Sequence, residues 1–156
     1  MMIINNNNIF LNAEQIKKLI SLGLLLEDCE FYLYKFTNNK FNENGDLIKI
    51  DDDFYYEVEE RGRFVIGQEK SQSSWYECTE IIPTLDLQGV LKEISKIKYS
   101  SFGFPIVQLY YGYNDGLWRI SFRNPEKFEN PGIKNKSPLQ VAYETLIFLL
   151  EKNGKI

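Results

Sequence analysis

Apolar residues recur at helical spacing in three separate stretches of the chain. In the first stretch, Ile16, Leu19 and Ile20 fall on one helical face. Asn12 is placed to cap the start of this helix, and Gly23 suits the position just beyond its end. The pattern therefore predicts a helix over about residues 13–22.

Two further helices are predicted nearer the C-terminus. One follows Pro83-Thr84, and its apolar stripe consists of Leu87, Val90, Leu91 and Ile94. The other begins at Ser137-Pro138, where the serine caps the first turn and the proline takes the first helical position. Its apolar stripe continues to about Lys152.

Between these helices the sequence is rich in aromatic and β-branched residues and poor in helix formers, which is typical of strands. Strands are predicted at residues 31–36, 47–50, 54–59, 63–66, 75–78, 106–111 and 117–123. Asn44-Gly45 and Asp115-Gly116 are turn pairs, and the second is the strongest hairpin signal in the chain. Polar loops are predicted at residues 68–74 and 124–136.

These elements predict an α+β fold. We expect one antiparallel sheet of about five to seven strands, with two or three helices packed mainly on one face. The first helix would cover an end or an edge of this sheet. The length suits a single domain over residues 1–156, in which residues 38–74 form inserted hairpins.

Alternation along the last predicted hairpin separates two sets of side chains. The set expected to face the core is Trp118, Ile120 and Phe122. The set expected to face solvent or a partner is Arg119, Ser121 and Arg123.

Composition narrows the possible chemistry. The chain has no histidine, which excludes histidine-based triads and histidine-containing zinc sites. Its two cysteines, Cys29 and Cys78, form neither a redox pair nor a disulfide framework, so we expect buried, reduced thiols in a cytoplasmic protein. No stretch has the apolar length of a membrane span, and the N-terminal residues do not resemble a secretory signal. No membrane partner is expected.

Two acidic groupings could in principle bind metal or perform acid–base chemistry. The run Asp51-Asp52-Asp53 would suit a hard cation, but neighbouring strand residues point to opposite faces, and we expect an acidic turn. Paired carboxylates of the glycosidase type could come from Glu57, Glu59, Glu60 and Asp86. Charged residues that keep strand edges solvated are the commoner case. We expect no catalytic residue, no metal site and no cofactor.

Two surfaces are better candidates for binding. Arg119 and Arg123, with Gln108 and Tyr110 on the neighbouring strand, would form a sheet face suited to stacked bases or an acidic partner. A second pair of possible anchors is Trp75 and Tyr76.

The order of several segments resembles a known group of proteins. The segments are residues 13–22 followed by residues 28–32, the helix start at residues 82–85, the strand Trp118-Arg119-Ile120, and the helix containing Ala142-Tyr143-Glu144. Together they resemble small uncharacterised proteins of gut-type bacteria and their phages and prophages. The C-terminal part is similar to the phage ABA sandwich domain. Residues 38–74 have no counterpart in this resemblance.

The resemblance implies a cytoplasmic protein of phage or mobile-element origin that acts by binding. We therefore expect a non-enzymatic binding or adaptor protein, with a role in modulating a host system. A protein partner is favoured, and a homodimer is a further option. The alternatives are a nucleic-acid-binding module that uses Arg119 and Arg123 and, more distantly, a small carboxylate-based hydrolase.

Overall fold

The computed structural model describes residues 9–41, 43–70, 76–97, 106–123 and 132–153. It divides into two compact units. The inserted unit is Leu26–Thr84, and the terminal unit combines Met1–Leu25 with Leu85–Ile156. The compact insertion is thus longer than the range 38–74 that sequence suggests, and the single-domain expectation stays a prediction.

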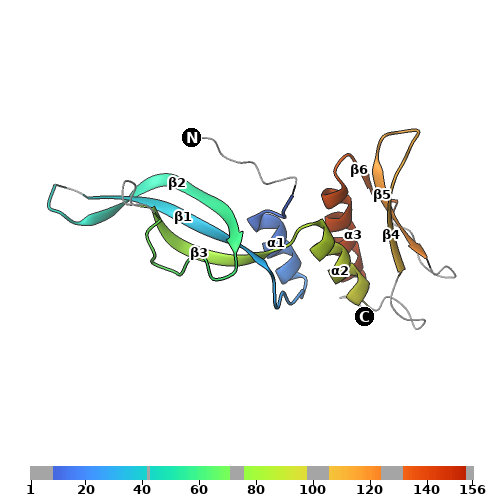
Figure 1. The fold of residues 1–156 in the computed structure, drawn as a ribbon, viewed down its shortest axis with the longest axis horizontal. Coiled ribbons are helices and arrows are strands. Elements are labelled where there is room, and N and C mark those ends of the chain that lie inside the picture. The colour runs from blue at the N-terminus through green and yellow to red at the C-terminus, as the bar shows by residue number, and fades with distance from the viewer. Residues whose placement is uncertain (1–8, 42, 71–75, 98–105, 124–131, 154–156) are drawn as a thin grey trace. The chain divides into compact units, whose positions relative to one another are not determined.

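The predicted α+β class is confirmed, but the single sheet is wrong. The described residues form two three-stranded antiparallel sheets, one in each unit, together with three helices (Figure 1). The sequence pattern finds strands by their alternation, which does not specify the sheet to which each strand is added.

The inserted unit consists of β1 (Phe31–Phe41), β2 (Leu47–Glu60) and β3 (Tyr76–Thr84), in the order β2-β1-β3. The β1–β2 turn contains Gly45, whose φ of 81° matches the predicted Asn-Gly turn. Residues 47–50 and 54–59, predicted as separate strands, belong to the one strand β2.

The acidic turn predicted at Asp51-Asp52-Asp53 is also wrong, because these residues continue β2. The β1–β2 register shifts between Thr37 and Asn39, opposite the stretch of β2 that holds the three aspartates. A bulge of this kind takes up extra residues without ending the strand. The aspartate side chains lie outside those that the structure describes.

The strand predicted at residues 63–66 is a turn region instead. Gly62 and Gly67 flank it with φ of 77° and 86°, which a continuing strand cannot adopt. The Tyr34 hydroxyl donates to the Glu60 carbonyl at 2.9 Å and accepts from the Arg63 N–H at 3.2 Å. The hydroxyl therefore fixes the chain as it leaves β2.

An aromatic cluster on one face of this sheet explains why the turn region is apolar. Tyr34, Phe36 and Cys78 are buried there. The ring of Phe64, from the turn region, lies edge-on to Tyr34 and Phe36 with centroids 5.3 and 5.1 Å apart. Such contacts stabilise a core beyond the area they bury. Phe64 thus covers the sheet face rather than extending the ladder.

The terminal unit contains α1 (Ala13–Ser21), α2 (Leu87–Lys96) and α3 (Pro138–Asn153). It also holds the sheet of β4 (Ile106–Tyr111), β5 (Trp118–Arg123) and the short β6 (Lys134–Asn135). β6 falls in the predicted loop 124–136, of which residues 124–131 are outside the described ones. A two-residue strand has too short an alternation to be seen in sequence.

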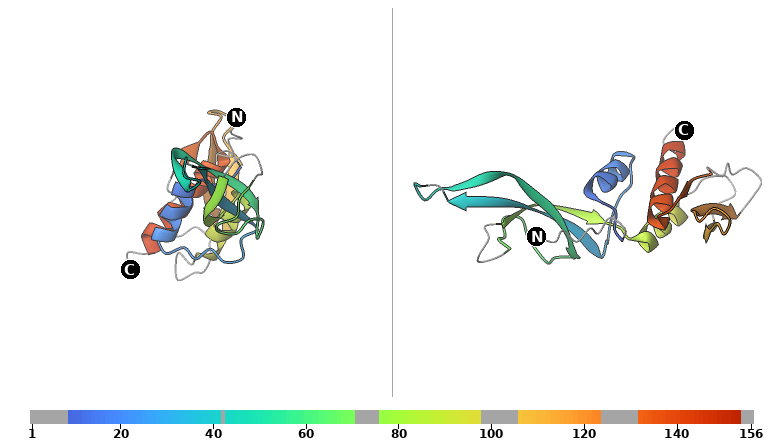
Figure 2. Two further views of the ribbon diagram at one scale, coloured as in Figure 1. Left: turned by 90° about the vertical axis from the view of Figure 1, so that its left-hand side faces the viewer. Right: turned by 90° about the horizontal axis from the view of Figure 1, so that it is seen from above.

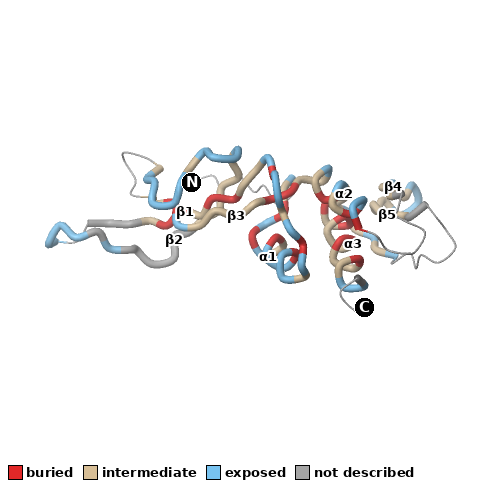
Figure 3. The backbone as a smooth tube through the Cα atoms, turned by 90° about the horizontal axis from the view of Figure 1, so that it is seen from below, coloured by how far each residue is buried: buried red, intermediate tan, exposed pale blue. Residues whose placement is uncertain are grey.

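Helices α2 and α3 lie on the same side of this sheet (Figures 1 and 2), where α2 contacts β4 and α3 contacts β5 and β6. This agrees with the expected packing of the second and third helices. The first helix contacts α3. Buried positions concentrate along α3 and its neighbours (Figure 3), and they include Ile94, Ile120, Leu146 and Leu149.

Caps define where the helices begin. Asn12 and Gln15 form the predicted capping box, and the Ser137 hydroxyl accepts the Gln140 N–H at 3.3 Å. The cap of α2 is Asp86, whose carboxylate accepts the Gly89 N–H at 2.8 Å. Sequence analysis placed Asp86 in a possible carboxylate pair, but its role here is to start a helix.

The cap predicts a graded effect of substitution. Asp86→Ala removes the acceptor for the Gly89 N–H and should lower the free energy of unfolding by about 1 kcal/mol, measured by urea denaturation. Asp86→Asn keeps an acceptor oxygen and should stay close to the parent protein. Equal losses in both variants would show that the carboxylate charge matters more than the hydrogen bond.

Candidate functional site

The outer face of the terminal sheet brings together side chains from three strands. Tyr110 on β4 pairs with Arg119 on β5, and Arg119 pairs with Lys134 on β6. Gln108 pairs with Ser121 one step along the same face. Directly paired residues point to the same side of a sheet, so these five side chains form one polar and aromatic surface.

Within this face the Arg119 side chain is held in place. Its guanidinium pairs with the Asp115 carboxylate from the hairpin turn and lies 5.8 Å from the centre of the Tyr110 ring. The other oxygen of Asp115 accepts the Leu117 N–H at 3.1 Å. One carboxylate therefore fixes both the turn and the cation beside it.

The electrostatics follow from these contacts. The Leu117 hydrogen bond, together with the charges of Arg119 and Lys134, lowers the pKa of Asp115 below its ordinary value of 3.8. Asp115 is consequently ionised at neutral pH, and it balances one of the two cations in the row. Arg119 Nε is buried and has no hydrogen-bond partner among the described residues.

Gly112 makes this arrangement possible. A Cβ atom at this position would lie 2.5 Å from Asp115 Oδ1 and 2.8 Å from Arg119 Nη2. The ion pair therefore crosses directly over the backbone, where only a glycine leaves room.

Aromatic residues are exposed at the tip of the hairpin. Tyr113 is 95% exposed, and Tyr111 is 52% exposed. The Tyr111 ring lies edge-on to Trp118, with centroids 5.4 Å apart. Tyr111 alternates to the helix side of β4, so it does not share the outer face. We call the set Gln108, Tyr110, Tyr113, Arg119 and Lys134 the hairpin surface.

The site residues named from sequence fall in different places. Gln108, Tyr110 and Arg119 share a face, as alternation predicts. Arg123 lies in β5 opposite Ile106, but its side chain is outside those described. Trp75 is outside the described residues, and Tyr76 belongs to the inserted unit, where its ring is edge-on to Tyr55 at 5.5 Å. Tyr76 thus packs with the aromatic cluster.

Sequence reasoning missed three members of the site. The sequence pattern predicts Asp115 only as a turn residue and does not single out Tyr113, although a tyrosine inside a tight turn has few neighbours that can bury it. Lys134 falls in a predicted loop. Its place beside Arg119 depends on the two-residue strand β6, for which the sequence carries no signal.

Two of the carboxylates weighed for catalysis have structural partners: Asp86 caps α2, and Glu57 takes part in an ion pair. In the inserted unit, Glu57 pairs with Lys70, whose ammonium group also lies 5.2 Å from the Phe36 ring centre. Burial acts to lower the pKa of Lys70, but its contacts with Glu57 raise that pKa above 10.5. Lys70 is therefore charged at neutral pH, and its contact with Glu57 ties the loop before β3 to β2.

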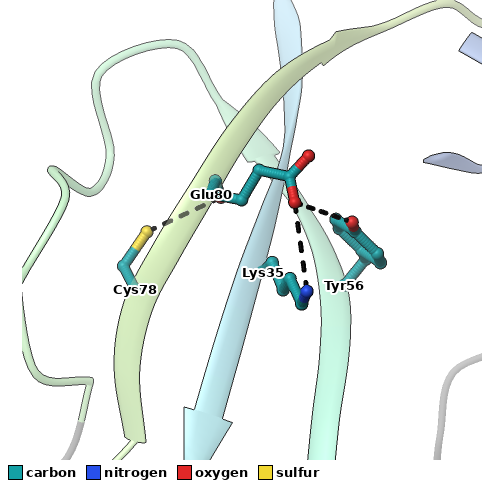
Figure 4. Close-up of polar contacts among 4 residues, drawn as sticks. All are labelled: Lys35, Tyr56, Cys78 and Glu80. Atoms are coloured by element: carbon teal, nitrogen blue, oxygen red, sulfur yellow. Dashed lines mark hydrogen bonds and ion pairs between the residues drawn. The ribbon is translucent and has the colours of Figure 1, made fainter. Parts of the chain in front are cut away.

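A second cluster in the same unit is centred on Glu80 (Figure 4). Its carboxylate accepts from the Tyr56 hydroxyl at 3.2 Å and lies 4.0 Å from Lys35 Nζ. These residues come from β3, β2 and β1, so the cluster joins all three strands. The Cys78 thiol contacts the Glu80 carbonyl at 3.9 Å.

Both cysteines are buried, as expected, and burial raises the pKa of Cys78 above 9.0. A raised pKa disfavours the thiolate, which is the nucleophilic form. Among the described residues, no three histidine, cysteine, aspartate or glutamate side chains are grouped so that they could hold a metal ion. Nor does any helix in the described ranges have the length and apolar character needed to span a membrane.

Comparisons with known proteins give no relative. No protein-family model matches the chain, and neither a curated protein nor a solved structure is detectably similar to it.

The Asp115 contacts predict a measurable titration. Its pKa, followed by carboxyl ¹³C NMR, should lie below 3.8 and should rise in Arg119→Gln, which removes one of the three groups that lower it. Because the folded-state pKa is lowered, Asp115 stabilises the hairpin above its unfolded pKa, and this contribution is lost as pH falls through the folded value. An unchanged pKa in Arg119→Gln would contradict the described pair.

Proposed function

We propose that this protein is a binding module that engages a protein partner through the hairpin surface. The observation that carries the proposal is the 95% exposure of Tyr113 in the hairpin turn, together with the exposed ring of Tyr110 on the outer face of the same hairpin. Tyrosine and arginine are enriched where proteins bind one another, since each offers a large contact area and a polar group. Because β4 and β5 are paired, the backbone beneath these side chains is already ordered before a partner binds.

A protein partner is favoured over nucleic acid by the charge at the site. Asp115 is paired with Arg119, so the outer face does not present two unopposed cations. The whole chain has a net charge of −4, whereas nucleic-acid affinity depends mainly on neutralising phosphates. The alternative keeps one favourable feature, namely that Lys134 and Tyr110 flank Arg119 on the same face.

The proposed origin, location and biological role of the protein rest on the sequence resemblance alone. A mobile-element origin, a cytoplasmic location and a role in modulating a host system stay predictions, and so does the absence of enzymatic activity.

Site-specific photocrosslinking can test the proposal. A photoreactive phenylalanine in place of Tyr113 should crosslink one protein species in lysate of the native host. The same probe at Val65, which is 62% exposed in the inserted unit, serves as the matched control and should not capture that species. Arg119→Ser combined with Tyr110→Ser should remove most of the product, because both substitutions alter the surface without touching Tyr113.

The outcomes separate the alternatives. Crosslinks to nuclease-sensitive material, lost steeply as salt is raised, would favour the nucleic-acid module. Equal products from positions 113 and 65, or none from position 113, would overturn the proposal.

A further inference from the structure

Strand β4 has one hydrogen-bonding edge that no described strand occupies. The sheet order is β4-β5-β6, so β4 pairs with β5 on one side only. At the turn, Gly112 donates its N–H to the Leu117 carbonyl at 2.7 Å, so Gly112 and Leu117 form a hydrogen-bonded pair. Hydrogen-bonded and non-hydrogen-bonded pairs then alternate along β4 and β5. By this alternation Gln108 and Tyr110 direct their backbone groups toward β5, whereas Val107, Leu109 and Tyr111 direct theirs to the outer edge.

The composition of β4 distinguishes it from the other edge strands. Its sequence, Ile-Val-Gln-Leu-Tyr-Tyr, contains no charge and no proline, and four of its six residues are β-branched or aromatic types that favour strands. Edge strands of monomeric proteins are usually blunted by charge, proline, shortness or a covering segment. Uncharged, regular edges are the ones that pair with another strand.

Each of the other edges has such protection. β6 has only two residues, one of them a lysine, and β2 carries six acidic residues. β3 includes Glu77, Glu80 and Pro83. The loop that precedes β3 also pairs along it, through hydrogen bonds from Gly67 to Cys78, from Cys78 to Gln68 and from Lys70 to Tyr76. Protection is thus lacking at β4 alone among the described edges.

We infer that β4 pairs antiparallel with β4 of a second copy of this chain. A two-fold axis perpendicular to the sheet would place Leu109 opposite Leu109 of the second copy and Val107 opposite its Tyr111. All the outward backbone groups of these three residues are then matched, giving about six N–H···O=C bonds. No other register that keeps the faces aligned matches all three residues within β4.

The side chains are compatible with this register. On the helix side, Leu109 meets its own copy and Val107 meets Tyr111, which joins apolar to apolar surface. Val107 and Leu109 are only half-buried, whereas Ile120 beside them on β5 is 3% exposed, so this part of the helix-side face has area left to bury. On the outer face Gln108 lies opposite Tyr110, and no like charges are opposed.

The chemistry of the edge selects a second copy over an unrelated ligand. An open backbone edge is satisfied by another extended strand, and β4 is complementary to itself in pattern and charge. Five paired residues bury less than the roughly 1,200 Å² typical of tight complexes, so we expect a reversible dimer seen at high protein concentration. The pairing involves the backbone of β4, and it does not rest on the proposed partner of the hairpin surface.

Sedimentation velocity on the full chain across a concentration series gives the first test. The parent protein should shift from monomer to dimer as concentration rises. Gln108→Lys with Tyr110→Lys places lysines opposite one another twice across the two-fold axis and should weaken dimerisation at least about tenfold. Both positions are solvent-exposed, so the fold should tolerate the change.

The matched control reverses one charge. Gln108→Lys with Tyr110→Glu places lysine opposite glutamate in the same register and should restore the dimer. Tyr113→Ser should leave dimerisation unchanged, which separates this inference from the proposed partner binding. A parent protein that stays monomeric at the highest concentration, or charge variants that dimerise equally, would overturn the inference.

Disulfide trapping tests the register directly. Under mild oxidation, Leu109→Cys should form a covalent dimer, because opposed Cα atoms in a hydrogen-bonded pair are about 5.5 Å apart. Ser121→Cys, on the inner strand β5, should stay monomeric, and the buried Cys29 and Cys78 should not compete. Trapping at position 121 rather than 109 would show that another surface associates.

Discussion

Burial of one face of the β4–β5–β6 sheet under α2 and α3 is the constraint on which the terminal unit depends. Ile120 is 3% exposed on this face, and Ile94, Leu146 and Leu149 are fully buried in the helices that cover it. Successive strand residues point to opposite sides, so fixing Ile120 inward forces Arg119 and Ser121 outward. The hairpin surface is therefore a direct product of the core. A register slip of one residue would bury the guanidinium and expose the isoleucine.

The features that the sequence predicts correctly are those that depend on a few neighbouring residues. The capping box at Asn12 and Gln15, the cap at Ser137 and the glycine turns are chemical rules that act over a few residues. The same holds for the alternation that places Gln108, Tyr110 and Arg119 together, because strands joined by a tight turn inherit its register. These features could be read without any knowledge of the fold.

The missed features depend on distant contacts. Residues 63–66 are mostly apolar, as strand residues often are. In the structure, however, Phe64 packs against the rings of Tyr34 and Phe36 on a sheet face. The run Asp51-Asp52-Asp53 looks like a turn, yet the bulge opposite Thr37 and Asn39 carries it inside β2. The assignment of strands to the two sheets depends on pairings between distant segments, which no local pattern encodes. The same is true of the pairing of Lys134 with Arg119.

The first and last residues of the inserted sheet are direct neighbours: Phe31 at the start of β1 pairs with Thr84 at the end of β3. The inserted sheet therefore begins and ends at neighbouring positions, so its two ends are as close together as those of a short loop. Closure entropy grows only slowly with length, so such a segment adds little conformational cost to the fold that hosts it. Because its two ends meet, the segment of residues 26–84 requires only one short gap in the polypeptide that flanks it.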